Sequence, residues 1–193
     1  GRTSWMWSWD WSSVNSAGSR ENSGSHDMTE TRTFKTSWGW MTVTASAKGV
    51  TSIDLFPSVR TVRHDSHRDE AAASIVKEAQ AQLLSYLDGE RREFALPIDW
   101  SAGTSFQRKV WKAIAGIPYG RVRSYQWVAM RVGGKQYARA VGMALGANPV
   151  PIVVPCHRII AHDGSLGGFS SGLPLKRRLL GLEGTLTQLR NAR

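Results

Sequence analysis

Residues 148–160 read Asn-Pro-Val-Pro-Ile-Val-Val-Pro-Cys-His-Arg-Ile-Ile and constrain the fold more than any other stretch of the chain. Their three prolines stiffen the backbone and exclude a regular helix. We expect residues 152–154 to form a short buried extended segment, which places Cys156 on rigid backbone at the edge of the core. A lone cysteine is commonly an inert buried residue, but His157 and Arg158 favour the thiolate, which is the nucleophilic form. The segment therefore predicts a nucleophile at Cys156.

Backbone geometry limits which side chains can act as a base for this cysteine. Adjacent side chains of an extended segment point to opposite sides, so Cys156 and His157 need a bend or a bridging water to exchange a proton. His157 also needs a carboxylate to orient it, and residues 101–193 contain only Asp163 and Glu183. Glu183, at the end of the last predicted helix, is the better candidate. The pattern thus predicts a hydrolase-like Cys–water–His–Glu relay.

The region before this segment is predicted to hold a helix-turn-helix. Ser124 can cap a helix that runs to about Val132, where the glycine pair 133–134 ends it, and another helix is expected over residues 137–147. A helix, a glycine turn and a second helix in a basic region are typical of a helix-turn-helix. Helix pairs joined by glycines also occur in bundles, so this alternative stays open.

The second helix of this pair carries few side chains suited to reading bases. Val141 and Leu145 are four residues apart and are expected to face the core. Another face carries small or flexible residues and one charged side chain: Arg139, Gly142, Met143 and Gly146. A helix that reads the major groove needs several Arg, Asn or Gln side chains. The pattern favours sequence-independent binding in a narrow groove with one inserted side chain, or else tight packing against another helix.

The chain divides into segments with different patterns. Residues 1–27, with alternating tryptophans and a Ser/Gly-rich stretch, are expected to be a leader foreign to the fold. Residues 28–96 alternate like paired strands and continue into an amphipathic helix. After a connector over residues 97–103, residues 104–193 are mainly helical. We therefore predict an α+β fold, with a small N-terminal α/β-sheet domain followed by a mainly helical C-terminal domain with a helix-turn-helix.

The net charge of +10 is concentrated in the C-terminal half of the chain. Residues 101–193 carry 14 Lys and Arg against two acids, whereas residues 1–100 carry 11 against 13. A basic half favours nucleic acid as the partner, because neutralising phosphates releases counterions; a merely solvated basic surface is the alternative. A single cysteine excludes an internal disulfide and a multi-cysteine zinc site. No apolar run approaches the ~18 residues of a membrane span, so no transmembrane helix is expected. The cysteine usage, with no apolar secretory segment near the start, predicts a cytoplasmic protein.

Ordered motifs over residues 106–184 resemble one known family. They are Ile-Pro-Tyr-Gly at 117–120, Ser-Tyr-Gln at 124–126, Ala-Arg-Ala-Val-Gly at 138–142, Asn-Pro at 148–149, Pro-Cys-His-Arg at 155–158, a glycine-rich run at 164–172 and Leu-Glu-Gly at 182–184. This set resembles the O6-alkylguanine-DNA alkyltransferases, also called methylated-DNA–protein-cysteine methyltransferases. The likeness over residues 28–96 is looser, as the variable N-terminal domain of that family implies.

The resemblance implies DNA repair by direct reversal, once per molecule and without a cofactor. Cys156 would take the alkyl group from guanine O6, with O4-alkylthymine as a further substrate left open, in an irreversible displacement. His157 would deprotonate Cys156 through water, and Glu183 would orient His157. Tyr125 would hydrogen-bond guanine N3 and supply a proton to the leaving base. Asn148 would tie the second helix of the helix-turn-helix, the recognition helix, to the active-site segment.

The resemblance also implies contacts with the flipped base and with DNA. The implied substrate-binding residues are Tyr125, Pro151, Ile159, Gly167 and Ser170. The implied DNA-binding residues are Ser124, Ala138, Arg139, Gly142 and Arg158. Arg139 would enter from the minor groove and fill the gap that the extruded base leaves. The partner would be double-stranded DNA containing O6-alkylguanine, bound largely without sequence preference by a protein that is monomeric in solution, with cooperative assembly on DNA left open.

Two other functions remain open on the sequence. A lesion-binding protein without chemistry is the first, although Cys156 argues against it. A cysteine hydrolase is the second, and Arg139 and the helix-turn-helix would then have no purpose. No metal site is expected, because His64 and His67 lie in a polar stretch and such pairs are usually solvated. The basic run at residues 176–178 is predicted to be a solvated helix face near DNA.

Overall fold

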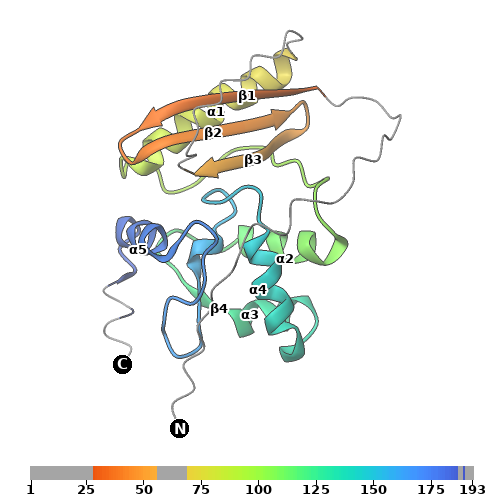
Figure 1. The fold of residues 1–193 in the computed structure, drawn as a ribbon, viewed down its shortest axis with the longest axis vertical. Helices are drawn as coiled ribbons and strands as arrows, with labels where there is room; N and C mark the ends of the chain where they lie inside the picture. The colour runs from red at the N-terminus through yellow and green to blue at the C-terminus, as the bar shows by residue number, and fades with distance from the viewer. Residues whose placement is uncertain (1–27, 56–68, 187–188, 190–193) are drawn as a thin grey trace.

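The computed structural model describes residues 28–55, 69–186 and 189. The predictions for residues 1–27 and for the histidines at 64 and 67 therefore lie outside the described residues. Two lobes are stacked on one another, a sheet with one helix and a group of shorter helices (Figure 1). The predicted α+β class is confirmed, while the boundaries at residues 96 and 103 stay a prediction. None of the described helices is long and apolar enough to cross a bilayer.

The N-terminal lobe is a three-stranded antiparallel sheet covered on one face by a helix. Its strands follow in sequence order: β1 (Thr29–Thr36), β2 (Gly39–Ser46) and β3 (Gly49–Leu55). Alternation along β2 buries Met41 and Val43, as expected for a strand with one covered face. The covering helix is α1 (Glu70–Leu87), and Asp69 caps its start through two backbone N–H groups. The sheet and α1 thus pack against each other through their apolar faces.

Within the described residues, the C-terminal lobe contains α-helices and several very short elements. These are α2 (Ser105–Ala115), β4 (Arg123–Ser124), α3 (Tyr125–Val132), the 3₁₀ helix η2 (Lys135–Tyr137), α4 (Ala138–Gly146), the 3₁₀ helix η3 (Cys156–Arg158), β5 (Ile159–Ile160) and α5 (Leu173–Leu182). The predicted Ser124 cap is confirmed, since its hydroxyl accepts from the Trp127 N–H at 3.1 Å. The helix expected from residue 137 begins instead at residue 138, because residues 135–137 form η2.

The pair α3–α4 rests on α2. The Trp111 indole N–H of α2 donates to the carbonyl of Ala144 in α4 at 2.7 Å. Lys109 of α2 donates to the carbonyl of Val132, the last residue of α3, at 3.0 Å. Within α4, Val141 and Leu145 are buried, as predicted, whereas Met143 is 67% exposed. The face around Arg139 is therefore presented outward by helices that α2 holds in place.

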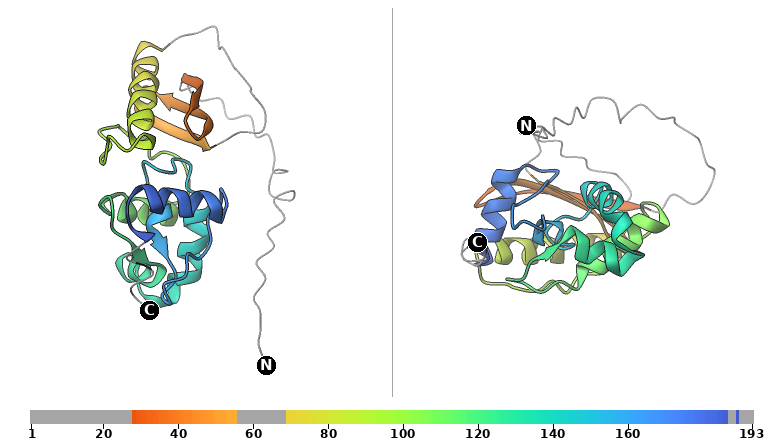
Figure 2. Two further views of the ribbon diagram at one scale, coloured as in Figure 1. Left: turned by 90° about the vertical axis from the view of Figure 1, so that its left-hand side faces the viewer. Right: turned by 90° about the horizontal axis from the view of Figure 1, so that it is seen from below.

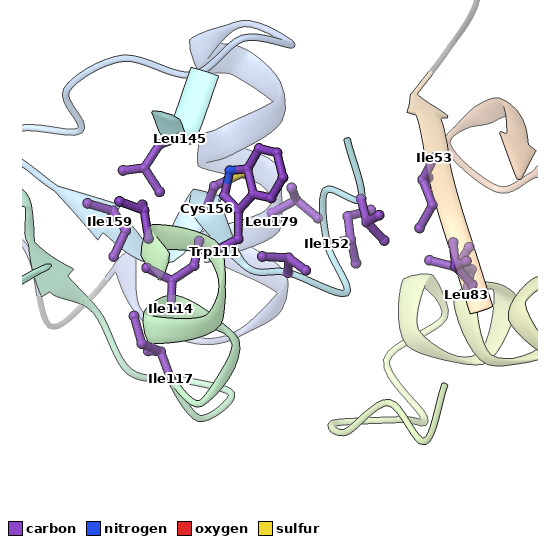
Figure 3. Close-up of a cluster of buried hydrophobic side chains, with 14 of the residues drawn as sticks. Ile53, Leu83, Trp111, Ile114, Ile117, Leu145, Ile152, Cys156, Ile159 and Leu179 are labelled. Carbon is purple, nitrogen blue, oxygen red and sulfur yellow. The ribbon is translucent and has the colours of Figure 1, made fainter. Parts of the chain in front are cut away.

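The two lobes share one core and several hydrogen bonds. The apolar cluster includes Ile53 and Leu83 from the N-terminal lobe and Trp111 and Ile114 from the C-terminal lobe (Figure 3). The Ile53 N–H donates to the Pro149 carbonyl at 2.8 Å. In the left view of Figure 2 the sheet and α1 lie against one end of the helical lobe. The segment after α4 is therefore supported from both lobes.

Two sequence predictions about local structure are wrong. Residues 152–154 are not extended, because Ile152 has a φ of 73° in a tight turn that a bridge from Pro151 to Val154 closes. Prolines on both sides withhold the N–H groups that a strand ladder requires. The basic run at residues 176–178 is not uniformly solvated, because Lys176 is fully buried while Arg177 and Arg178 are exposed. Polar carbonyls around Lys176 make this burial possible.

Candidate functional site

Cys156 is the first residue of the 3₁₀ helix η3 and lies in the core of the C-terminal lobe. Its side chain is 5% exposed and lies in the cluster that contains Trp111 and Leu179 (Figure 3). The residues after Cys156 form β5, which pairs in parallel with β4 and aligns Ser124 with Ile160. Because α3 starts directly after β4, this pairing brings the first residue of the helix-turn-helix to the cysteine segment.

Asn148 connects the end of α4 to the sulfur. Its Nδ2 donates to Cys156 Sγ at 3.2 Å and to the Val154 carbonyl at 2.9 Å. Its Oδ1 accepts from the Val150 N–H at 3.1 Å. All of these contacts fix the amide, so the tie between the recognition helix and the cysteine segment is present as a hydrogen-bonded link. A donor aimed at the sulfur stabilises the thiolate more than the thiol.

The cysteine rests as a thiol at neutral pH. Burial raises the pKa of Cys156, and the Asn148 hydrogen bond and the Lys176 charge oppose that rise only in part. Backbone N–H groups of Cys156 and His157 lower it further, yet the balance stays above the ordinary value. A thiol of this kind reacts through a base that removes its proton when needed.

His157, the residue that follows Cys156, is buried beside a carboxylate. Its Nε2 lies 2.9 Å from Glu183 Oε1, and both side chains are fully buried. Burial lowers the pKa of His157 and Glu183 opposes this, so the ring is neutral at pH 7. Because Glu183 is ionised, Nε2 carries the proton and donates it, which leaves Nδ1 as the acceptor. Among the described residues, Nδ1 is buried without a protein hydrogen-bond partner, so it can take a proton.

Glu183 is held as a carboxylate by several donors. Burial alone would raise its pKa, but hydrogen bonds from His157 and Arg158 and their charges lower the pKa to about 2. Arg158 Nη2 reaches Oε1 at 2.8 Å, and Tyr86 of α1 donates to the same oxygen at 2.7 Å. Asp163, the other acid considered from the sequence, accepts from Ser165 in an exposed turn. The choice of Glu183 as the partner of His157 is therefore confirmed.

Arg158 does not lie at the DNA surface where the sequence predicted it. It is 5% exposed, its Nε and Nη2 bind Glu183, and its Nη1 donates to the Ile117 carbonyl at 2.5 Å. The 3₁₀ turn of η3 directs it into the core, where Glu183 compensates its charge. We therefore assign Arg158 to the Glu183 cluster and not to DNA binding.

Tyr125 lies between α4, the predicted recognition helix, and residues 164–172. We call these residues the glycine loop. Its hydroxyl accepts from the Gly168 N–H at 3.2 Å and lies 3.3 Å from the Gly168 carbonyl. A Cβ added to Gly142 of α4 would lie 3.9 Å from the ring, and one added to Gly167 would lie 2.8 Å away. Glycine at residue 167 therefore allows the loop to approach the ring. Burial raises the pKa of Tyr125, so its hydroxyl stays protonated.

The other predicted site residues occupy defined places around these groups. Ala138 and Arg139 begin α4, Ile159 begins β5, Pro151 is buried in the tight turn, and Ser170 is exposed on the glycine loop. Their contacts with substrate or DNA stay predictions. Among the described residues, no three His, Cys, Asp or Glu side chains gather closely enough to hold a metal ion.

Two residues at the site were not predicted from the sequence. Tyr86 reaches Glu183 from 97 residues away, and no local pattern marks such a contact. Lys176 lies in a basic run, which suggested a solvated face, although its place at an i−3 spacing from the apolar Leu179 was a usable sign of burial.

The site and its scaffold define a class of protein. In this class a buried cysteine is followed by a histidine that pairs with a glutamate, and the segment that carries them lies beside a helix-turn-helix. Comparison with known proteins is more specific. Residues 105–185 match the family model described as 6-O-methylguanine DNA methyltransferase, DNA binding domain. The chain belongs to the family of methylated-DNA–protein-cysteine methyltransferases.

Individual relatives support this assignment. The inducible methylated-DNA–protein-cysteine methyltransferase of Bacillus subtilis is 47% identical over 102 residues, which cover 53% of this chain and 56% of the relative. The Mycolicibacterium paratuberculosis protein of the same name is 50% identical over 105 residues, 54% of this chain and 63% of the relative. These matches thus span less than two thirds of both relatives. The crystal structure of Mycobacterium tuberculosis OGT in complex with DNA is 38% identical, with a TM-score of 0.67 over 79% of this chain and 91% of that chain.

Proposed function

We propose that this protein repairs DNA by moving the alkyl group of O6-alkylguanine irreversibly to its own Cys156. The observation that carries the proposal is the set of groups around the sulfur. Asn148 donates to Sγ, and the neighbouring His157 is paired with Glu183. The pairing of β4 with β5 brings Tyr125, the first residue of α3, close to the segment that carries Cys156. The names of its relatives, which are methyltransferases of methylated DNA, agree with this use.

The chemistry is a direct displacement at carbon. The Cys156 proton passes through one water to Nδ1 of His157, and the Glu183 carboxylate stabilises the imidazolium that forms. The sulfur forms a bond to the alkyl carbon as the bond from that carbon to guanine O6 breaks. The released electron pair goes to the base, which Tyr125 protonates at N3, and the proton on His157 is finally returned to Tyr125. Because a thioether is a poor leaving group, each molecule reacts once.

Access to the guanine requires that it leave the base stack. Extrusion costs roughly a few kcal/mol, and less for a weakened alkylated pair. The exposed face of α4, with Arg139 as its charged side chain, is the surface we assign to the minor groove. Arg139 would occupy the space of the flipped base, while the glycine loop and Ser170 would contact that base. The protein would act as a monomer in the cytoplasm, where a thiol stays reduced.

Intact mass spectrometry tests the transfer. The protein is incubated with a duplex oligonucleotide that contains one O6-methylguanine, and peptide mapping then locates the modification. We expect one added methyl group on Cys156 and none in Cys156→Ala. Binding without a mass change would indicate a lesion-binding protein. Catalytic turnover of an ester or amide that is independent of DNA would indicate a cysteine hydrolase.

A comparison of two substrates tests the role of Arg139. Arg139→Ala should slow transfer from duplex DNA much more than transfer from free O6-benzylguanine, because the free base needs no extrusion. Lys135→Ala, another exposed cation nearby, serves as a control for general loss of charge. Equal losses on both substrates would show that Arg139 plays no part in extruding the base.

Affinity for duplex DNA should fall steeply with salt and depend little on flanking sequence.

A further inference from the structure

Trp127, in the first turn of α3, has two guanidinium groups over its ring. The guanidinium carbon of Arg131 lies 4.2 Å from the ring centre, and that of Arg123 lies 5.3 Å from it. Residues four apart on a helix are neighbours, so Trp127 and Arg131 share one side of α3, and Arg123 reaches the same ring from β4. We call Arg123, Trp127 and Arg131 the arginine–tryptophan row.

The arginine–tryptophan row lies on the outer side of α3. Val128 and Val132 of this helix are buried in the core. By contrast, both arginines of the row are exposed and the tryptophan is half-buried. The helix α3 itself lies at the end of the C-terminal lobe that is away from the sheet (Figure 1). The two charges of the row are therefore presented to solvent, where a partner can reach them.

Neither guanidinium of the row has a counter-charge within the described residues. No carboxylate there forms an ion pair with Arg123 or Arg131, and the hydrogen bond that the Arg123 side chain donates goes to the Val122 carbonyl at 3.1 Å. Sharing one ring keeps the two charges within about 10 Å of each other, which is the Debye length at 0.1 M salt. Two like charges at this distance repel, and the repulsion is relieved when anions bind to them.

The chemistry of the row fits phosphate. Arginine binds phosphate oxygens in pairs through the N–H groups at the edge of its planar guanidinium, and a guanidinium that lies over an aromatic ring keeps that edge free. The ring also restricts both long side chains in the free protein, so less conformational entropy is lost when they bind. A partner with several phosphate groups can engage both guanidiniums at once.

The place of the row in the helix-turn-helix indicates which phosphates these are. Arg123 directly precedes Ser124 and Tyr125, and Tyr125 meets the glycine loop beside the reactive site. In a helix-turn-helix the first helix crosses the sugar–phosphate backbone while the second helix enters the groove. Since α4 is the helix that we assign to the groove, we expect the row on α3 to meet the backbone beside the lesion.

We propose that the arginine–tryptophan row is a second DNA contact, which binds backbone phosphates flanking the alkylated guanine and is separate from the face of α4 around Arg139. The inference rests on the proposed function, because it concerns the DNA that carries the substrate. Phosphate contacts position a protein on DNA without reading its sequence. A row that only shielded the indole from water would affect the stability of the fold and leave DNA binding unchanged.

The salt dependence of binding tests for these phosphate contacts. Affinity for an unmodified duplex is measured from about 50 to 200 mM salt. Arg123→Gln and Arg131→Gln should each lower the slope of log affinity against log salt by about 1, and the double variant should lower it by about 2. Arg177→Gln, which removes an exposed charge from α5, is the matched control and should leave the slope unchanged. A slope in the double variant equal to that of the unaltered protein would overturn the proposal.

Variants of Trp127 test the role of the ring. Trp127→Leu keeps both charges but removes the surface on which they rest, so affinity for the duplex should fall about two- to fivefold. Trp127→Tyr keeps an aromatic ring and should bind within about twofold of the unaltered protein. Thermal unfolding shows whether each variant is folded. Unchanged affinity in folded Trp127→Leu would contradict the proposal, and if Trp127→Leu does not fold, the two arginine variants decide it.

Neutral replacements of single phosphates locate the contact. A methylphosphonate, which lacks the negative charge, is placed at one position at a time in a duplex with one O6-methylguanine, and binding is measured in a Cys156→Ala background that prevents transfer. We expect positions flanking the lesion to weaken binding of the protein with both arginines and to have no effect on the double variant. If the same positions weaken both proteins equally, the row does not contact them and the proposal is wrong. If the unaltered protein binds the duplex but accepts no methyl group, the proposed function fails, whereas the salt slopes still report on the row.

Discussion

Lys176, near the start of α5, and Glu183, the residue that caps the end of α5, are buried charges seven residues apart, and their surroundings differ. Seven residues make about two helical turns, so both side chains face η3. Glu183 receives hydrogen bonds from His157, Arg158 and Tyr86, and Arg158 cancels its charge. Lys176 donates its hydrogen bonds only to carbonyl oxygens among the described residues. Because Arg158 compensates the charge of Glu183, this residue anchors the surrounding cluster. The charge of Lys176 has no such partner among the described residues, and it lowers the pKa of Cys156.

Removal of the Glu183 charge should have the largest effect on stability. Glu183→Gln leaves the buried Arg158 without its counter-charge, and breaking such a pair costs about 3–5 kcal/mol. Asp163→Asn is the matched control, because Asp163 lies in an exposed turn. Urea denaturation of both variants measures the difference in unfolding free energy. Equal losses in the two variants would show that the Glu183 cluster is not an anchor.

The pH dependence of stability should separate the two charges next. The pKa of Glu183 is lowered from 4.5 to about 2, so its contribution of about 3 kcal/mol is present above about pH 4.5 and is lost as pH falls toward 2. The pKa of Lys176 is lowered from 10.5 to about 8. Its unfolded form binds the proton more tightly, so this group destabilises the fold below about pH 8, and stability is regained as pH rises from about 8 to 10.5.

Denaturation curves at several pH values test this contrast. The alkaline gain is measured in a Cys156→Ala background, which removes the thiol that titrates with Lys176. The gain should disappear when Lys176→Met is added and persist when Arg177→Met is added instead. A stability that is flat between pH 8 and 10.5 in the Cys156→Ala protein would mean that Lys176 is compensated after all.

The same contrast explains what the sequence could and could not predict. Local signals succeeded, because the Ser124 cap and the inward face of Val141 and Leu145 depend on residues within one or two helical turns. The His157–Glu183 pair was predicted because residues 101–193 contain only two acids. The path of residues 152–154 was missed, since the prolines around it admit a turn as readily as an extended segment.

Two long-range contacts of the site, those of Tyr86 and Arg158 with Glu183, had no sequence signal. Tyr86 reaches Glu183 across the two lobes, and Arg158 turns inward only because η3 bends the chain. Lys176 is buried only because carbonyls from two separate segments converge on it. Such contacts depend on how elements pack, which composition and periodicity do not report. Arg158 and Lys176 were therefore assigned to the surface, although the structure buries both.

Tyr86→Phe should have an intermediate effect that sharpens the picture of Glu183 as an anchor. The variant removes one buried hydrogen bond to a carboxylate, which is worth about 2 kcal/mol, while Arg158 and His157 remain. Tyr119→Phe is a natural control, because the Tyr119 hydroxyl donates to the neutral Leu182 carbonyl and should cost about 1 kcal/mol. Thermal and urea unfolding of both variants gives the two values. A smaller loss for Tyr86→Phe than for Tyr119→Phe would contradict the assignment.

The smallest expected effect on stability concerns the loop that Lys176 holds. Gly164 and Gly167 have φ values of 79° and 65°, so an alanine at either position is strained by about 1 kcal/mol. A Cβ at Gly164 meets nothing within 4 Å, whereas one at Gly167 lies 2.8 Å from the Tyr125 ring. Both variants should therefore lose the stability that the strained φ costs, but only Gly167→Ala should also crowd Tyr125, push the loop from its ring and slow alkyl transfer. Single-turnover transfer from free O6-benzylguanine measures this directly, and equal rates in the two variants would show that the fit of the loop against Tyr125 does not matter for the reaction.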